Sequence, residues 1–157
     1  MAHVTIEYMI MVPVLILEIF LFPFVATVIM DNWMDAQRNL ELQDIAGNIG
    51  SSIQQLYYTI SRADDSGTMQ LNLDIPQSVN QYAYTVTFGQ APQVDTSYKV
   101  MNVTLQFISA EGSSSSLVTL GNDIVWQNNL SFNSTTPSLS FVATKSGGNV
   151  VLTLGGA

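Results

Sequence analysis

Side chains that could perform catalysis or bind a metal ion are few in this sequence. The single histidine, His3, lies at the extreme N-terminus, and the chain has no cysteine with which it could share a metal ion. Asp64 and Asp65 are adjacent carboxylates in a turn rich in Ser and Gly, where acids usually face solvent. The serines at residues 113–116 have neither a G-x-S-x-G context nor a base to activate a hydroxyl. We therefore expect no catalytic residue, no metal site and no cofactor, and we expect that the chain is not an enzyme.

Three asparagines match the N-x-[ST] pattern of N-glycan acceptors: Asn102, Asn129 and Asn133. The pattern has chemical meaning only for a chain that is translocated across a membrane. Asn102 lies at the edge of a predicted strand, so a glycan there requires an outward-facing side chain. A sequence rich in Asn, Ser and Thr also produces such triplets by chance, so these sites are modest support for an exported domain.

An apolar run, YMIMVPVLILEIFLFPFVATVIM, covers residues 8–30. As an α-helix it would extend about 34 Å, close to the hydrocarbon thickness of a bilayer. Glu18 is its only charged side chain and costs about 3 kcal/mol at mid-bilayer, well below the summed gain of the Leu, Ile, Phe and Val residues. The run ends at Asp31, and Trp33 suits a membrane–water boundary. We expect residues 8–30 to span a membrane.

The helix is predicted to continue beyond this run in amphipathic form. Its apolar positions recur mostly every four residues: Ala36, Leu40, Ile45, Ile49, Ile53, Leu56 and Ile60. Gly47 and Gly50 weaken a helix by about 1 kcal/mol each and can mark the close approach of another helix. Pro13 and Pro23 each remove a backbone hydrogen bond, so we expect kinks there. We predict one long helix that ends near Ser61.

Beyond a turn at residues 62–67, the apolar pattern changes to a period of two. Seven strands are predicted, at residues 69–75, 82–88, 103–108, 116–120, 123–127, 138–144 and 150–154. Segments rich in Gly, Pro, Asn and Ser separate them. The pattern predicts an α+β fold, in which a long hydrophobic and amphipathic N-terminal helix (residues 1–62) precedes a small antiparallel β-sandwich-like head domain (residues 63–157).

Charge excludes one class of partner. The formal net charge is -8, and the fixed cations are Arg38, Arg62, Lys99 and Lys145. These are too few to neutralise a row of phosphates, so nucleic acid is not an expected partner.

Residues 3–8, HVTIEY, followed at once by the apolar run, resemble the start of archaeal type IV pilin-like proteins, the class III signal-peptide group with a Q-x-S-x-E-[YF] pattern. His3 and Thr5 stand where that pattern has Gln and Ser, and Met-Ala alone precedes them. In that family a short leader is removed, and the helix then leaves the membrane to form the core of a filament. The resemblance implies cleavage between Ala2 and His3, which makes Glu7 the fifth residue of the mature subunit. A mature chain that starts at the first residue would instead place Glu7 two residues out of this register.

The resemblance also implies roles and partners. The residues expected to take part in assembly are Glu7, Tyr8, Pro13, Glu18, Pro23 and Trp33. The implied partners are identical subunits in a helical filament, the membrane before assembly, a prepilin peptidase, the assembly machinery and N-linked glycans. Glu7 could pair with a neighbour's free α-amine, and Glu18 in a dry helical bundle needs a partner or a proton. The expected product is an extracellular filament on the cell surface, used for adhesion.

A single-pass membrane-anchored surface protein is the alternative. Its helix would stay in the bilayer, and its β head would bind a ligand or partner as a monomer. This alternative explains the length, the acidity and the glycan acceptors equally well. It explains less well the apolar stripe that continues to residue 60, because another helix or the head must cover such a stripe.

Overall fold

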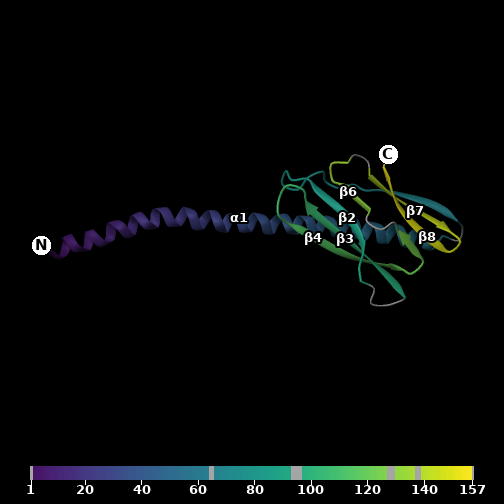
Figure 1. Cartoon of the computed structure of the whole chain (residues 1–157), viewed down its shortest axis with the longest axis horizontal. Coiled ribbons are helices and arrows are strands. Elements are labelled where there is room, and N and C mark those ends of the chain that lie inside the picture. The colour runs from purple at the N-terminus through teal and green to yellow at the C-terminus, as the bar shows by residue number, and fades with distance from the viewer. Residues whose placement is uncertain (1, 64–65, 93–96, 127–129, 137–138, 157) are drawn as a thin grey trace. The chain divides into compact units, whose positions relative to one another are not determined.

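A computed structural model describes residues 2–63, 66–92, 97–126, 130–136 and 139–156, with side chains from residue 9 to residue 155. Within these residues, one helix precedes eight strands (Figure 1). The elements are α1 (Ala2–Ser61), β1 (Gly67–Asn72), β2 (Tyr84–Gln90), β3 (Tyr98–Phe107), β4 (Ser113–Gly121), β5 (Ile124–Trp126), β6 (Leu130–Asn133), β7 (Leu139–Ser146) and β8 (Asn149–Gly156). The predicted α+β class is confirmed: one long N-terminal helix is followed by two small, mainly antiparallel sheets in a sandwich-like arrangement.

Helix α1 is continuous through Pro13 and Pro23 and ends at Ser61, the residue that the sequence predicts. The chain divides into two compact units, Met1–Gln37 and Arg38–Ala157. The second unit, called the head unit below, therefore contains the last part of α1 together with all the described strands.

The strands of the head unit form two sheets, with the orders β4-β3-β2-β6 and β1-β7-β8-β5. The predicted strands differ from these at most of their ends: β1 stops at Asn72 rather than at residue 75, and β3 starts at Tyr98 rather than at residue 103. Three further differences concern β6, β4 and β5. Strand β6 was not predicted, because it depends on pairing with β2 rather than on a pattern in its own four residues. Residues 113–115 were predicted to be a break, but they begin β4. An all-antiparallel head was expected, but β5 pairs with β8 in parallel; no hairpin joins these two strands, because the chain passes through β6 in the other sheet and returns through β7.

Aromatic rings join the two sheets. The Phe88 ring on β2 meets the Phe141 ring on β7 edge to face, with 5.2 Å between their centres, and it stacks on Phe132 of β6 at 5.9 Å. One side of α1 completes this core through Leu42, Ile45, Ala46, Ile49, Ile53, Leu56, Tyr57 and Ile60. The head unit thus covers the predicted apolar stripe from Ile45 onward, whereas Ala36 and Leu40 are exposed.

Gly50 allows α1 to approach β4 closely. A Cβ atom added at Gly50 would lie 2.7 Å from Val118 Cγ2, whereas one added at Gly47 would meet nothing within 4 Å. We expect Gly50→Ala to lower the free energy of unfolding by about 1–3 kcal/mol through overpacking. The matched variant Gly47→Ala should raise it by about 0.5–1 kcal/mol, since alanine is the better helix former. Thermal unfolding of the detergent-solubilised full chain measures both, and equal shifts of the same sign would refute this close approach.

Candidate functional site

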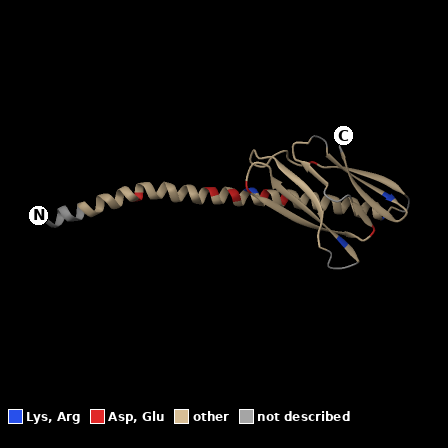
Figure 2. Ribbon diagram, in the orientation of Figure 1, with Lys and Arg blue, Asp and Glu red and all other residues tan. Residues whose placement is uncertain are grey.

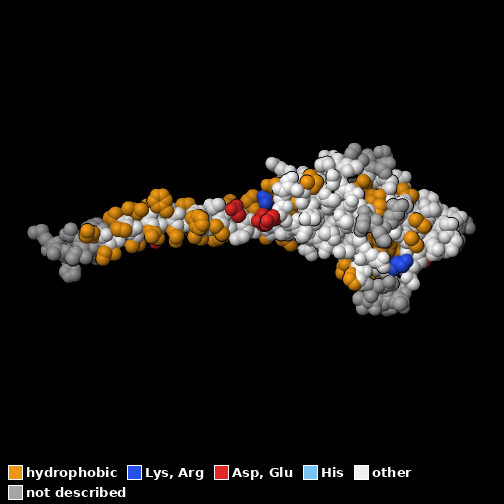
Figure 3. Space-filling view, in the orientation of Figure 1, with side chains coloured by type: hydrophobic (Ala, Val, Ile, Leu, Met, Phe, Trp, Pro, Cys, Tyr) orange, Lys and Arg blue, Asp and Glu red, His pale blue; other side chains and the backbone are white. Residues whose placement is uncertain are grey.

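The first candidate site is the apolar segment of α1, residues 9–30. Its large hydrophobic side chains are exposed in the single chain: Phe20 is 74% exposed, Phe22 78% and Ile19 66%. Hydrophobic atoms cover this part of the helix in the space-filling view (Figure 3). Within the described residues, α1 is the one helix that is long and apolar enough to cross a membrane. The apolar segment is therefore compatible with membrane insertion.

The boundary of the apolar segment agrees with the sequence analysis. Glu18 is its one charged residue, and its side chain is exposed. The next carboxylates, Asp31 and Asp35, follow the segment directly, and acidic residues appear on α1 just beyond its apolar part in Figure 2. Trp33, which lies between them in the sequence, is 60% exposed. An exposed indole beside the first carboxylates is typical of the interface between hydrocarbon and water.

One side of the apolar segment is hollowed into a shallow groove, lined by Pro13, Ile16, Leu17, Phe20, Leu21 and Phe24. Spacings of three and four residues place these side chains on one side of a helix. Grooves of this kind receive the side-chain ridges of a second helix. Near the second proline, Thr27 Oγ1 donates a hydrogen bond to the carbonyl oxygen of Pro23 over 2.8 Å.

Four of the predicted residues lie at the start of α1: Ala2, His3, Glu7 and Tyr8. Their backbone is helical, but their side chains lie outside those that the structure describes. Cleavage before His3 and pairing of Glu7 with an α-amine remain predictions.

The glycan acceptors lie in different environments. Asn133 is exposed at the end of β6, and its Oδ1 accepts a hydrogen bond from Thr85 Oγ1 over 3.0 Å. Asn102 lies inside β3, which starts five residues before the predicted strand, and it is half-buried on the face opposite to the core. Its Oδ1 is buried without a hydrogen-bond partner in the described structure. Asn129 lies outside the described residues.

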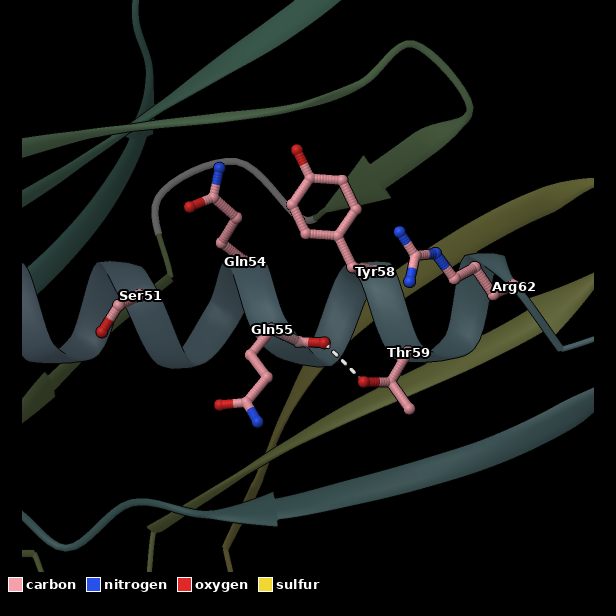
Figure 4. A pocket seen from close by; sticks show the side chains of 6 residues that line it. All are labelled: Ser51, Gln54, Gln55, Tyr58, Thr59 and Arg62. Carbon is pink, nitrogen blue, oxygen red and sulfur yellow. Dashed lines mark hydrogen bonds between the residues drawn. The ribbon is translucent and has the colours of Figure 1, made fainter.

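A second hollow, of about 590 Å³, lies along the exposed polar side of α1 in the head unit. Its lining residues are Ser51, Gln54, Gln55, Tyr58 and Thr59 of this helix and Arg62, which directly follows its last residue (Figure 4). Three of them are held by hydrogen bonds: Thr59 Oγ1 donates to the Gln55 carbonyl over 2.7 Å, Ser51 Oγ donates to the Asn48 carbonyl over 2.9 Å, and Gln54 Nε2 donates to the Thr119 carbonyl over 3.2 Å. The lining contains no carboxylate or imidazole, so it offers hydrogen bonding and one positive charge rather than acid–base catalysis.

Metal binding has no support in the described part of the chain, where no three His, Cys, Asp or Glu side chains come together. Asp64 and Asp65 lie outside the described residues. The serines at residues 113–116 are part of edge strand β4, on which they alternate between the two faces of the sheet.

Two sets of polar contacts, made by Asp123 and by Lys145, fasten the end of α1 to the rest of the head unit. Tyr57 donates its hydroxyl hydrogen to Asp123 Oδ1 over 2.5 Å. Lys145 Nζ on β7 donates to the carbonyl oxygens of Ser61 over 2.8 Å and of Ala63 over 2.5 Å. Because the last turn of α1 contains no basic residue, Lys145 supplies the positive charge that stabilises a helix C-terminus. Each pair is more than 60 residues apart in sequence, so no local pattern indicates it.

Two buried tyrosines, Tyr57 and Tyr84, should make the free energy of unfolding depend on pH in alkaline solution. Burial, reinforced by the hydrogen bond to Asp123, raises the pKa of Tyr57 to about 12, and burial raises the pKa of Tyr84 to about 12. In the unfolded chain both phenols titrate near pH 10. Between about pH 10 and 12 the folded chain therefore holds more protons, and the free energy of unfolding should fall as the pH rises, by at most about 1.4 kcal/mol per pH unit for each tyrosine. Below about pH 10 the two phenols should contribute no pH dependence.

Denaturant unfolding of the full chain in detergent at several alkaline pH values tests this expectation. The Tyr57→Phe variant should be less stable than the parent at neutral pH, because it lacks the hydrogen bond to Asp123. It should also lose less stability over the alkaline interval. Identical alkaline slopes for parent and variant would rule out Tyr57 as a source of the effect.

Comparisons of the chain with protein-family models, with curated proteins and with solved structures found no match.

Proposed function

We propose that this chain is the structural subunit of an extracellular filament of the archaeal type IV pilus kind, with α1 in the filament core and the β head on its surface. The observation that carries the proposal is the apolar segment, whose side chains are exposed on every side of the helix. Each large apolar side chain gains about 1.5–3 kcal/mol when it is buried. A segment of this size must therefore be buried, either in lipid or against the helices of other subunits.

Three features favour transfer of the apolar segment from the lipid bilayer into a bundle of protein helices. The start of the chain resembles the pilin-like pattern, with Glu7 and Tyr8 directly before the apolar run. The groove that begins at Pro13 has the spacing to receive a neighbouring helix. Pro23 leaves a carbonyl without its helical partner, and helices packed against it can satisfy such a group.

The apolar stripe beyond residue 40 does not distinguish the filament from a membrane-anchored protein. The head unit itself covers this stripe from Ile45 onward. Two large apolar residues of α1 that precede this covered part, Met34 and Leu40, are 41% and 61% exposed. In a filament these two side chains would contact neighbouring subunits.

Within this proposal the subunit is first inserted in the membrane by its apolar segment. A prepilin peptidase then cleaves before His3, and assembly transfers the helix into a bundle. Glu7 would set the register of an added subunit by pairing with a free α-amine, and Glu18 would need a hydrogen-bond partner in the bundle. The filament would serve adhesion, and the chain itself would perform no catalysis.

Electron microscopy of filaments sheared from source cells, combined with mass spectrometry of the subunit's N-terminus, tests the proposal. Regular fibres built of this chain, with a mature start at His3, are the expected result. An intact N-terminus in the membrane fraction, without fibres, would overturn the proposal and indicate an anchored ectodomain.

A further inference from the structure

The outer face of the sheet β4-β3-β2-β6, which is the face opposite to α1, carries no charged side chain among the described residues. Lys99 is the one charged residue on these four strands, and it belongs to the other face, where its Nζ donates to the Ile124 carbonyl over 2.6 Å. This face is therefore neutral, although the whole chain carries twelve acidic residues. Figure 2 shows these strands almost entirely without red or blue.

Hydroxyl groups form a row across this outer face. The strand register places Ser131, Thr87, Thr104 and Ser115 side by side on β6, β2, β3 and β4. The row crosses three spacings between strands, about 14 Å. Thr104 is half-buried, and the other three side chains are exposed. The row therefore offers hydrogen-bond donors and acceptors to a neutral polar molecule, with no charge to desolvate.

Asn133 lies at one end of the next row, directly beside Thr85. Its Oδ1 is oriented by the hydrogen bond from Thr85, so Nδ2, the atom that carries an N-glycan, is not needed to hold the side chain. The third residue of its acceptor triplet, Thr135, is exposed, whereas the middle residue, Ser134, is buried. Asn102 is the poorer acceptor of the two because it is half-buried in an interior strand.

We propose that Asn133 carries an N-linked glycan that lies across the outer face of this sheet, over the hydroxyl row. Sugar hydroxyls exchange hydrogen bonds with Thr87 and Ser115. The apolar face of a sugar ring covers Leu117, which is 67% exposed at the far side of the row. The glycan thus accounts for an exposed leucine on a neutral face that is rich in hydroxyl groups.

The attachment step requires a lipid-linked oligosaccharide as co-reactant. Nδ2 of Asn133 attacks C1 of the first sugar, the Nδ2–C1 bond forms and the bond from C1 to the phosphate oxygen breaks. The amide proton passes to a base of the transferase, and the polyprenyl phosphate leaves. The step requires an exported head, which a filament subunit and an anchored protein share.

The test uses the full chain purified from its source cells, with the Asn133 peptide analysed by mass spectrometry. Thr135→Ala removes the acceptor triplet without changing Asn133, and Thr135→Ser retains the triplet as the matched control. We expect Asn133 to be glycosylated in the parent and in Thr135→Ser, and Thr135→Ala to lower the Tm by about 2–6 °C. An unmodified Asn133 in the parent would overturn the inference.

A second pair of substitutions tests where the glycan lies. Thr87→Val and Ser115→Ala remove two hydroxyls of the row and belong to no acceptor triplet. In this double variant, the Tm difference caused by Thr135→Ala should shrink by at least half. If Thr135→Ala lowers the Tm equally in the parent and in the double variant, the glycan projects into solvent. A loss of filaments in the double variant whether or not the glycan is present would show that a second copy of the chain covers this face. Either result would overturn the inference.

Failure of this inference is distinguishable from failure of the proposed function. Filaments built of subunits with an unmodified Asn133 would refute the glycan and leave the filament. A glycosylated chain that forms no filament would refute the filament and leave the glycan.

Discussion

Replacement of Phe20 by glutamate is expected to abolish filament assembly while the head unit stays folded. Phe20 lies in the groove of the apolar segment and is 74% exposed in the single chain. In a helical bundle a carboxylate at this position would be buried without a built-in partner, at a cost of several kcal/mol in every subunit. On the insertion scale the same change costs about 2.5–3.5 kcal/mol, which the remaining apolar residues offset, so the precursor should still enter the membrane.

Filament yield by electron microscopy and subunit content of the membrane fraction measure this effect. We expect fibres to fall below about a hundredth of the parent yield, which corresponds to a loss of about 2.7 kcal/mol or more, while the precursor accumulates in membranes. Phe20→Leu is the matched control and should assemble, because it keeps the position apolar. Fibres of Phe20→Glu at the parent yield would be incompatible with a core built from this groove.

Gly121→Ala is expected to cause the largest loss of stability in the head unit for a single added methyl group. Gly121 is the last residue of β4, where the chain crosses to the other sheet. A Cβ atom there would overlap Tyr57 Oη and lie 2.5 Å from Asp123 Oδ1. The substitution therefore overpacks the contact and breaks the hydrogen bond between Tyr57 and Asp123. We expect the free energy of unfolding to fall by about 2–4 kcal/mol.

Gly89→Ala supplies the matched control, because a Cβ at this strand glycine would meet nothing within 4 Å. It should change the stability of the detergent-solubilised full chain by less than about 0.5 kcal/mol. Tyr57→Phe in the Gly121→Ala background should recover part of the loss, since it removes the nearest clashing atom. If the two glycine variants unfold alike, the contact of Gly121 with Tyr57 does not limit the space at this position.

Strong local periodicity made α1 predictable. The apolar run, its boundary at Asp31 and the helix end at Ser61 all follow from patterns within a few turns of helix. Seven of the strands followed from alternation in the same way, with errors at their ends. Strand β6 was missed because its four residues pair with β2 through a register that local sequence does not encode.

The candidate sites also differ in how far local sequence predicts them. The apolar segment and the positions of the glycan acceptors can be read from residue types alone. The environments of those acceptors cannot, because burial of Asn102 and exposure of Asn133 depend on which strands lie beside them. The hydroxyl row of the outer face likewise exists only after residues from separate strands have been aligned by hydrogen bonding.

The sequence by itself determined that this chain has one helix of membrane-spanning length and a β-rich remainder, because hydrophobic periodicity acts over neighbouring residues. The tertiary structure alone decided how α1 is fastened to the head, through Tyr57 with Asp123 and through Lys145 with Ser61. It also decided that β5 pairs with β8 in parallel. These contacts join residues far apart in the chain, and their formation depends on packing of the whole core rather than on any local preference.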